Sequence, residues 1–216
     1  MQTTLYLADC KVLKDKGLYS FWFEKMPEKR QKKISRIKMD KDRRLSLGAG
    51  ILLEKVLKQY DKSSVRIDKN GKPYLPESDI YFSLSHSGDY ALLAVSDLPV
   101  GCDIEIISEY NDKLAKRFFH DEEYALLQNS EDRQRLFYRL WTLKESVIKA
   151  DGRGLTMSLD SFFISFKNGL PSASVNGKNY FLKEYEAPLS YCVSACCEGE
   201  SRFGQDLKIV DLKKEE

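Results

Sequence analysis

The hydrophobic pattern of the first half of the chain changes period once, from helical to strand-like spacing. Residues 3–8 favour a short opening strand, and the basic segment 21–36 favours a helix interrupted near Pro27. Apolar side chains then recur every three or four residues, which predicts a helix over 41–60; they are Leu45, Ala49, Leu52, Leu53 and Val56. Short β-type runs separated by glycine turns follow, and they predict a meander. Its strands are expected at 65–67, 72–75, 81–85 and 90–96.

The second half repeats this order of helix followed by strands. Helices are expected at 121–128 and 132–150, and strands at 161–166, 179–186 and 191–196. Two short segments also recur in letters. Asp68-Lys-Asn-Gly-Lys-Pro73 is echoed by Phe166-Lys-Asn-Gly-Leu-Pro171, and Tyr90-Ala-Leu-Leu-Ala-Val-Ser96 by Tyr191-Cys-Val-Ser-Ala-Cys-Cys197. Matches in the same order, each after a long helix, favour an internal duplication. We therefore expect an α+β fold of two similar halves, 1–107 and 108–216, related by a pseudo-two-fold axis, with a ligand cleft between them.

Composition narrows the function without identifying it. The chain has 216 residues, of which 42% are hydrophobic and 12% aromatic, enough for a sizeable core. Lys and Arg (35) nearly balance Asp and Glu (33), so no global charge points to nucleic acid or to a membrane surface. No apolar run approaches the roughly 18–20 residues that span a bilayer, and no secretory signal is visible, which favours the cytoplasm. The five cysteines are irregularly spaced and are expected to be reduced and mostly buried.

An acidic strand is the first candidate for chemistry. Residues 99–107 form an apolar run in which Asp103 and Glu105 stand two positions apart, on one face of the strand. Two carboxylates so close together repel each other, and a divalent cation with a preference for oxygen ligands, Mg²⁺ above all, would relieve the repulsion. The alternative is a half-exposed strand whose acids pair with Lys or Arg on a neighbouring strand.

The helix expected at 132–150 carries the second candidate. Its core stripe is formed by Leu136, Leu140, Leu143 and Val147. On an adjoining face, Trp141, Glu145 and Lys149 follow one another at spacings of four residues. In isolation, the spacing of Glu145 and Lys149 favours an ordinary helical ion pair over a functional site.

The two candidates together carry a family resemblance. Gly-Cys-Asp-Ile-Glu at 101–105 is followed, after about forty positions, by Trp-Thr-Leu-Lys-Glu-Ser-Val-Ile-Lys-Ala at 141–150. The chain closely resembles the 4'-phosphopantetheinyl transferases of the surfactin-synthetase-activating type, whose signature joins a G-(I/V)-D-x-E strand to a W-x-x-K-E-x-x-x-K helix. Further matching positions occur in the same order, at 71–73, 82–88, 117–119, 123–124 and 152–155. The family fold implied by this resemblance also has two similar α+β halves with the active site between them.

The resemblance implies roles for the acids and the lysine. Asp103, Glu105 and Glu145 would hold Mg²⁺, which bridges them to the pyrophosphate of coenzyme A. Glu145 would also help to deprotonate the carrier serine, and Lys149 would stabilise the pyrophosphate oxygens; with Asp103 they form the expected catalytic set. Glu123 matches a further family acid near the metal, against the alternative of an exposed helix residue.

The resemblance also implies contacts with coenzyme A. They are Arg44, Lys72, Pro73, Ser85, His86 and Lys149. Lys72 and Pro73 match positions that line the adenine, whereas Ser85, His86 and Arg44 match positions near phosphates, where a histidine gains a raised pKa. The segment 25–44 holds ten Lys or Arg against three acids, which suits both the phosphates of coenzyme A and an acidic carrier protein. Within it, the residue pattern does not distinguish Lys29, Lys32 and Lys33 as the phosphate contact.

The expected reaction is a Mg²⁺-dependent transfer of 4'-phosphopantetheine from coenzyme A to a serine of an apo carrier protein, releasing adenosine 3',5'-bisphosphate. The alternative is a Mg²⁺-dependent hydrolase that cleaves a nucleotide pyrophosphate with the same three acids and no carrier. The resemblance implies a monomer, while the balanced charge and the lack of a nucleic-acid motif or a long apolar run indicate no nucleic-acid or membrane partner. Whether its carrier is an acyl, peptidyl or aryl carrier domain depends on a docking surface that the motifs do not specify.

Overall fold

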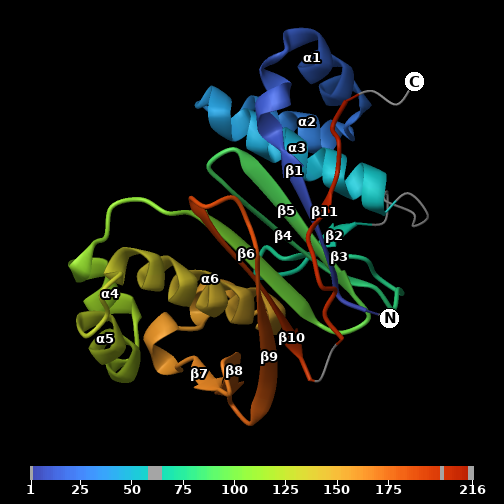
Figure 1. The fold of residues 1–216 in the computed structure, drawn as a ribbon. Coiled ribbons are helices and arrows are strands. Elements are labelled where there is room, and N and C mark those ends of the chain that lie inside the picture. The colour runs from blue at the N-terminus through green and yellow to red at the C-terminus, as the bar shows by residue number, and fades with distance from the viewer. Residues whose placement is uncertain (1, 58–64, 200–201, 214–216) are drawn as a thin grey trace.

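Two β-sheets lie between two groups of helices in the computed structural model, which describes residues 2–57, 65–199 and 202–213 (Figure 1). The first sheet has the strand order β11-β1-β5-β4. Its strands are β1 (Thr4–Asp9), β4 (Tyr81–Ser87), β5 (Tyr90–Ser96) and β11 (Lys208–Ile209). The helices on this side are η1 (Cys10–Lys14), α1 (Lys16–Lys25), α2 (Glu28–Ser35) and α3 (Asp40–Val56). Pro27 separates α1 from α2, as the sequence predicts, because proline cannot continue the hydrogen bonding of the preceding helix.

The second sheet has the order β6-β10-β9-β8-β7 and is covered by the longest helix, α6. Its strands are β6 (Val100–Ile106), β7 (Ser165–Lys167), β8 (Leu170–Val175), β9 (Lys178–Tyr185) and β10 (Tyr191–Glu198). The helices are α4 (Asp112–Phe118), α5 (Asp121–Gln128), α6 (Arg133–Asp151), η3 (Gly154–Thr156) and η4 (Leu159–Ser161). A separate ribbon pairs β2 (Arg66–Ile67) with β3 (Pro73–Tyr74). The α+β class is therefore confirmed.

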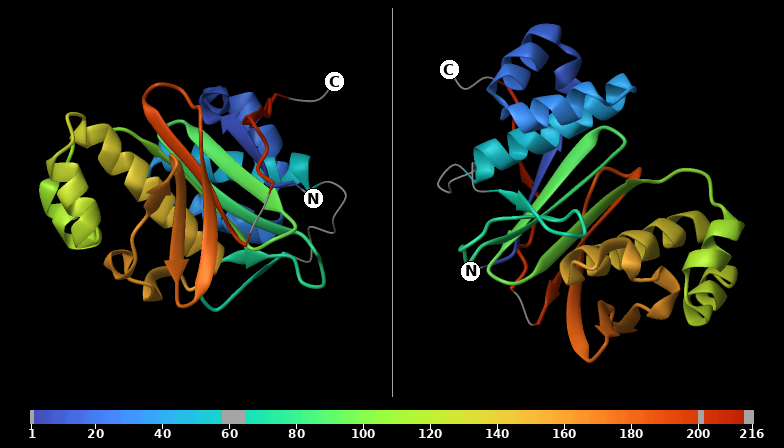
Figure 2. Two further views of the ribbon diagram at one scale, coloured as in Figure 1. Left: turned by 60° about the horizontal axis from the view of Figure 1, so that its bottom comes forward. Right: turned by 180° about the vertical axis from the view of Figure 1, so that it is seen from behind.

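Buried side chains form three layers of core. One layer joins α1–α3 to the first sheet, and another surrounds α6 and its neighbours. The third lies between the two sheets, where apolar residues of β1 and β5 meet those of β6 and β10. Figure 2 shows the resulting order, with α1–α3 on one side, the strands in the middle and α6 on the other side. The strands β5, β6 and β10 are thus covered on both faces, which explains why nearly all of their residues are buried.

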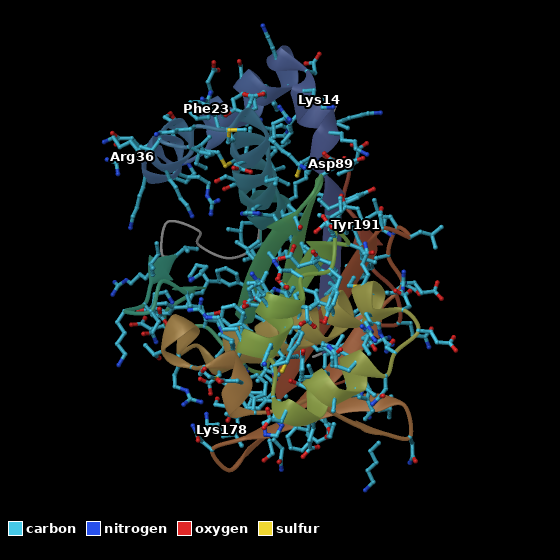
Figure 3. All side chains as sticks on the ribbon, turned by 90° about the vertical axis from the view of Figure 1, so that its left-hand side faces the viewer. Lys14, Phe23, Arg36, Asp89, Lys178 and Tyr191 are labelled. Atoms are coloured by element: carbon cyan, nitrogen blue, oxygen red, sulfur yellow. The ribbon has the colours of Figure 1, made fainter. Side chains whose placement is uncertain are left out.

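The two sheets also meet at their ends. Tyr90 and Tyr191, which open the two repeated segments, pack edge to face with ring centroids 5.0 Å apart. The Tyr191 hydroxyl accepts a hydrogen bond from the backbone N–H of Asp89 at 3.0 Å, and the two residues lie together in Figure 3. A side chain at Gly88 (φ +60°) would collide with this tyrosine. The turn between β4 and β5 is therefore fixed against the second sheet.

Strand pairing crosses the expected boundary between 1–107 and 108–216 in both directions. β6, from the first half, pairs with β10 in the second sheet, and β11, from the end of the chain, runs parallel to β1. Each half contains a long helix, α3 or α6, followed by antiparallel strands, as the pattern predicts. The division at residue 107 stays a prediction.

Several local predictions differ from the structure. A strand was expected over 161–166, but the chain forms η4 and then the short strand β7. The helix α4 and the strands β8 and β11 were not expected. The helix expected over 41–60 ends at Val56, with its C-cap at Leu57, and residues 58–60 lie outside the described part of the chain. Within the described part, no helix has the length and apolar character needed to cross a bilayer.

Candidate active site

Asp103 is the centre of a buried polar cluster on β6. Its side chain is 3% exposed, and its Oδ1 accepts hydrogen bonds from Ser85 Oγ and Lys149 Nζ, both at 2.6 Å. The other oxygen, Oδ2, is buried and accepts no hydrogen bond from the described residues. Leaving a buried carboxylate oxygen unpartnered is costly. The lysine that pairs with Asp103 lies on α6 and not on a neighbouring strand. Oδ2 has no partner among the described residues.

Glu105 and Glu145 complete an acidic group around Asp103. Glu105 lies on the same face of β6, and its Oε2 accepts a hydrogen bond from Ser87 Oγ at 2.6 Å. Burial raises the pKa of Glu105 to about 7, and the negative charges of Asp103 and Glu145 act in the same direction. Burial and Asp103 also raise the pKa of Glu145, whereas Lys149 lowers it. The three carboxylates therefore interact electrostatically; the strand spacing predicts this for Asp103 and Glu105, and the family resemblance implies it for Glu145.

Close packing between α6 and β6 brings these groups together. Gly101 has no side chain, and a Cβ at this position would lie 1.9 Å from the backbone oxygen of Ser146. This approach lets Lys149 Nζ reach Asp103 Oδ1 and Ser85 Oγ (2.9 Å). Burial lowers the pKa of Lys149, but the charge and hydrogen bond of Asp103 together with the nearby Cys102 and Glu145 outweigh this effect, and the net shift is upward. The simple helical ion pair between Glu145 and Lys149 is not formed, because the lysine binds Asp103 instead.

Glu123 does not join the acidic group. It is 2% exposed, and its Oε2 accepts a hydrogen bond from Lys144 Nζ at 2.6 Å, while Oε1 accepts one from Ile164 N at 2.8 Å. Lys144 is fully buried and also donates to the backbone oxygen of Phe162. Neither of the expected alternatives, a metal-site acid or an exposed helix residue, describes this pair. It links α5, α6 and the segment before β7.

A cavity of about 520 Å³ adjoins Glu145 and Lys149. Its other walls are the loop with Lys72 and Pro73, the segment 152–159, and the residues Ser83, Leu84 and Phe118. Lys72 Nζ donates to the backbone oxygens of Lys149 (2.5 Å) and Val100 (3.3 Å), so the lysine holds its loop against the ends of α6 and β6. A larger cavity, of about 840 Å³, lies between β1, β9 and the segment 205–209, away from the three acids. The smaller cavity is therefore the better candidate for the substrate.

The remaining residues expected to contact phosphates are Ser85, His86 and Arg44, and they differ in their relation to the acidic group around Asp103. Ser85 is in it, held between Asp103 and Lys149. His86, the next residue on β4, is exposed by surface area, yet desolvation lowers its pKa, and the positive charges of Lys149 and Lys33 lower it further. The protein's own residues therefore lower the pKa of His86, and a raised pKa would require a bound phosphate. Arg44 instead pairs with Asp40 at 2.5 Å.

The donors available suit a hard divalent cation, although they do not form a complete cage. Among the residues that the structure describes, no group of three or more His, Cys, Asp or Glu side chains is arranged to hold a metal ion. The buried, unpartnered Oδ2 of Asp103 and the raised pKa of Glu105 and Glu145 nevertheless fit the oxygen ligands that Mg²⁺ prefers. A rearrangement of the glutamate side chains would be needed to bring all three to one ion.

The sequence interpretation missed Ser83 and Ser87. Ser83 Oγ accepts a hydrogen bond from Cys102 N at 3.2 Å, and Ser87 Oγ accepts one from Ile106 N at 3.1 Å. A signal was present, because serine stands at every second position from 83 to 87 and period two puts all three on one face of a strand. What the sequence lacks is the information that β6 lies beside this face.

Comparison with known proteins extends over most of the chain. The family model described as the 4'-phosphopantetheinyl transferase superfamily matches residues 99–196. A second, described as the N-terminal part of 4'-phosphopantetheinyl transferase, matches residues 15–98. The two matched segments meet between β5 and β6.

Curated relatives show similar coverage. The 4'-phosphopantetheinyl transferase Sfp of Bacillus subtilis (strain 168) is 35% identical over 199 residues, which cover 87% of this chain and 88% of that protein. The 4'-phosphopantetheinyl transferase gsp of Aneurinibacillus migulanus is 37% identical over 69% of this chain and 66% of its own length. Among solved structures, the holo-[acyl-carrier-protein] synthase of Thermotoga maritima aligns with a TM-score of 0.42 and 22% identity over 49% of this chain and 64% of its own.

Proposed function

The chain belongs to the 4'-phosphopantetheinyl transferase superfamily, and we propose that it transfers 4'-phosphopantetheine from coenzyme A to a serine of an apo carrier protein with the help of Mg²⁺. One observation carries the proposal. A buried carboxylate with an unpartnered oxygen, two further carboxylates of raised pKa and one lysine gather beside a cavity. Such a group suits a reaction in which negative charge on a pyrophosphate must be bound and a hydroxyl must lose its proton.

The residues of the site suggest a division of labour. Asp103, Glu105 and Glu145 would hold Mg²⁺, which supplies positive charge to the pyrophosphate and to the leaving adenosine 3',5'-bisphosphate. Lys149 projects between Asp103 and the cavity and would bind a pyrophosphate oxygen. Glu145, in the cavity wall, would accept the serine proton while the serine oxygen forms its bond to phosphorus, because its raised pKa makes it a stronger base than an ordinary glutamate. The bond from phosphorus to the departing nucleotide then breaks.

The basic segment offers one lysine for the phosphates of coenzyme A. Lys29, Lys32 and Lys33 are all exposed on α2, but Lys32 pairs with Glu28 at 2.5 Å, and Lys33 is the one whose charge lowers the pKa of His86. We therefore assign the terminal phosphate to Lys33 and His86. Binding of that phosphate would raise the pKa of His86, since a negative charge favours the protonated imidazole. The rest of this basic surface suits an acidic carrier protein.

Mass spectrometry of an apo carrier protein tests the reaction. With this chain, Mg²⁺ and coenzyme A, the carrier should gain the mass of one phosphopantetheine, and EDTA should abolish the gain. Glu145→Gln should slow the transfer at least about 100-fold, as expected for loss of a general base. Glu122→Gln, which removes an exposed acid from α5, is the matched control and should leave the rate unchanged. Release of adenosine 3',5'-bisphosphate without any modified carrier would instead support the hydrolase.

Substrate comparison tests the phosphate assignment. Lys33→Ala should raise the KM for coenzyme A about tenfold and leave the KM for 3'-dephospho-coenzyme A nearly unchanged, because only the first substrate has the terminal phosphate. Lys29→Ala should change neither value. An equal loss for both substrates would contradict the assignment.

We further propose a monomer, since a single chain supplies both sides of the site, and light scattering during size exclusion would check it.

A further inference from the structure

β4 and β6 are neighbours that do not form a ladder. β4 is the last strand of the first sheet and β6 the last strand of the second, so each presents an edge to the other. Side-chain bonds take the place of the missing ladder at two points, where Ser83 Oγ accepts from Cys102 N and Ser87 Oγ accepts from Ile106 N. The alternate serines of β4 therefore close the junction between the sheets.

Two of these serines also bind the acids of β6, in the same manner. Ser85 Oγ donates to one oxygen of Asp103, and Ser87 Oγ donates to one oxygen of Glu105, both at 2.6 Å. The serines are two positions apart, and so are the acids, so the two contacts repeat along the junction. Within the described residues, the second oxygen of each carboxylate, Oδ2 of Asp103 and Oε1 of Glu105, accepts no hydrogen bond.

The hydroxyl of Ser87 makes two hydrogen bonds, one as acceptor and one as donor. It accepts the N–H of Ile106 at 3.1 Å and donates to Glu105, so its proton must point at the carboxylate. This fixes the Glu105 side chain relative to the strand that carries it, because the same hydroxyl holds the backbone of the next residue. Carboxylates that bind metals are commonly oriented by such hydrogen bonds, and losing one weakens metal binding.

We propose that Ser87 is a positioning residue, which holds Glu105 by one oxygen and leaves the other for a divalent cation, as Ser85 does for Asp103. The inference rests on the proposed function, since it assigns Ser87 to the metal site of the transferase. Ser87 does not line the candidate substrate cavity and would act through Glu105.

Cation binding provides the test, with Mn²⁺ as the probe and coenzyme A present. The Kd for Mn²⁺, obtained by measuring free Mn²⁺ with electron paramagnetic resonance, should be at least about tenfold higher in Ser87→Ala than in wild type. Ser87→Thr keeps the hydroxyl on a side chain suited to strands and should bind Mn²⁺ within about threefold of wild type. The KM for Mg²⁺ in the transfer assay should rise in Ser87→Ala more than kcat falls.

Ser83→Ala is the matched control, because it removes a bond to the same junction without touching an acid. Ser83 also lines the candidate substrate cavity, so the KM for coenzyme A is measured alongside. Cys102 N would lose its partner in the core, so Tm should fall, whereas the Kd for Mn²⁺ should stay within about twofold of wild type. Equal Mn²⁺ affinity in Ser87→Ala and wild type would refute the positioning role, as would an equal weakening in Ser83→Ala. Wild-type protein that binds no Mn²⁺ would overturn the proposed metal site itself, and the role of Ser87 with it.

Discussion

Gly101→Ala should be one of the most damaging single substitutions in this protein. The added methyl group would lie 1.9 Å from the oxygen of Ser146, 2.5 Å from the nitrogen of Ala150 and 3.0 Å from the carbonyl carbon of Lys149. All three are backbone atoms of α6, so no side-chain rotation relieves the contact. Ordinary contacts begin near 3.4 Å, and the helix would have to retreat by about 1.5 Å.

Stability and activity should both respond to this displacement. Overpacking of a core typically costs about 1–3 kcal/mol, and here the obstacle is a helix backbone, which favours the upper part of that range. Retreat of α6 would also separate Lys149 Nζ from Asp103 Oδ1, now 2.6 Å apart. Misplacement by about 1 Å can reduce a rate 100-fold, so we expect the transfer rate to fall by a similar factor even where the protein still folds.

Urea unfolding and the carrier assay would measure the two effects. Gly17→Ala is the control, because its methyl group would approach only the side chain of Asp15, at 3.3 Å, in an exposed helix. It should change the free energy of unfolding by less than about 1 kcal/mol and leave transfer intact. Normal stability and normal transfer in Gly101→Ala would show that α6 and β6 do not pack as closely as described.

Three further outcomes follow from the buried groups. In metal-free protein, Glu105 keeps its proton up to about pH 7 when folded and loses it near 4.5 when unfolded, so the folded state binds more protons between these values. The free energy of unfolding should therefore fall as pH rises from about 4.5 to 7, and Glu105→Gln should flatten the decline in a series of urea titrations. Lys144→Met should lower the free energy of unfolding by about 3–5 kcal/mol because it leaves Glu123 buried without its partner, and adding Glu123→Leu should recover part of the loss. All five cysteines are buried, so a thiol reagent such as DTNB should modify none in the native protein and five in denaturant.

The parts of the fold that the sequence predicts are those in which local periodicity decides the structure. α6 and β6 follow their apolar patterns, so spacing alone puts Asp103 and Glu105 on one face of β6, whereas only the family resemblance brings Glu145 to them. β11 could not be predicted, because its two residues become a strand only by pairing with β1, at the opposite end of the sequence. β8 contains Pro171 and several polar residues, which weaken a strand pattern.

Most errors in the predicted site concern residues whose contact partners are distant in the sequence. Charged residues are normally exposed, so nothing local indicates that Glu123 and Lys144 bury each other. Likewise, the alternate serines of β4 predict a polar face but not what lies against it. The resemblance names the acids, but only the three-dimensional arrangement reveals which hydroxyls hold them.

The position of the acids at the β4–β6 junction has an electrostatic consequence. Asp103, Glu105 and Glu145 lie near one another, Lys149 pairs with Asp103 alone, and burial together with mutual repulsion raises the pKa of both glutamates. A divalent cation would remove this repulsion, so its binding free energy would also favour the arrangement in which the two sheet edges meet. Because Ser87 links Glu105 to the backbone of β6 across that junction, cation binding and the closing of the sheets against each other should be coupled. Hydrogen exchange at Ile106, whose N–H binds Ser87, should therefore slow on addition of Mg²⁺ and coenzyme A, and unchanged exchange would argue against this coupling.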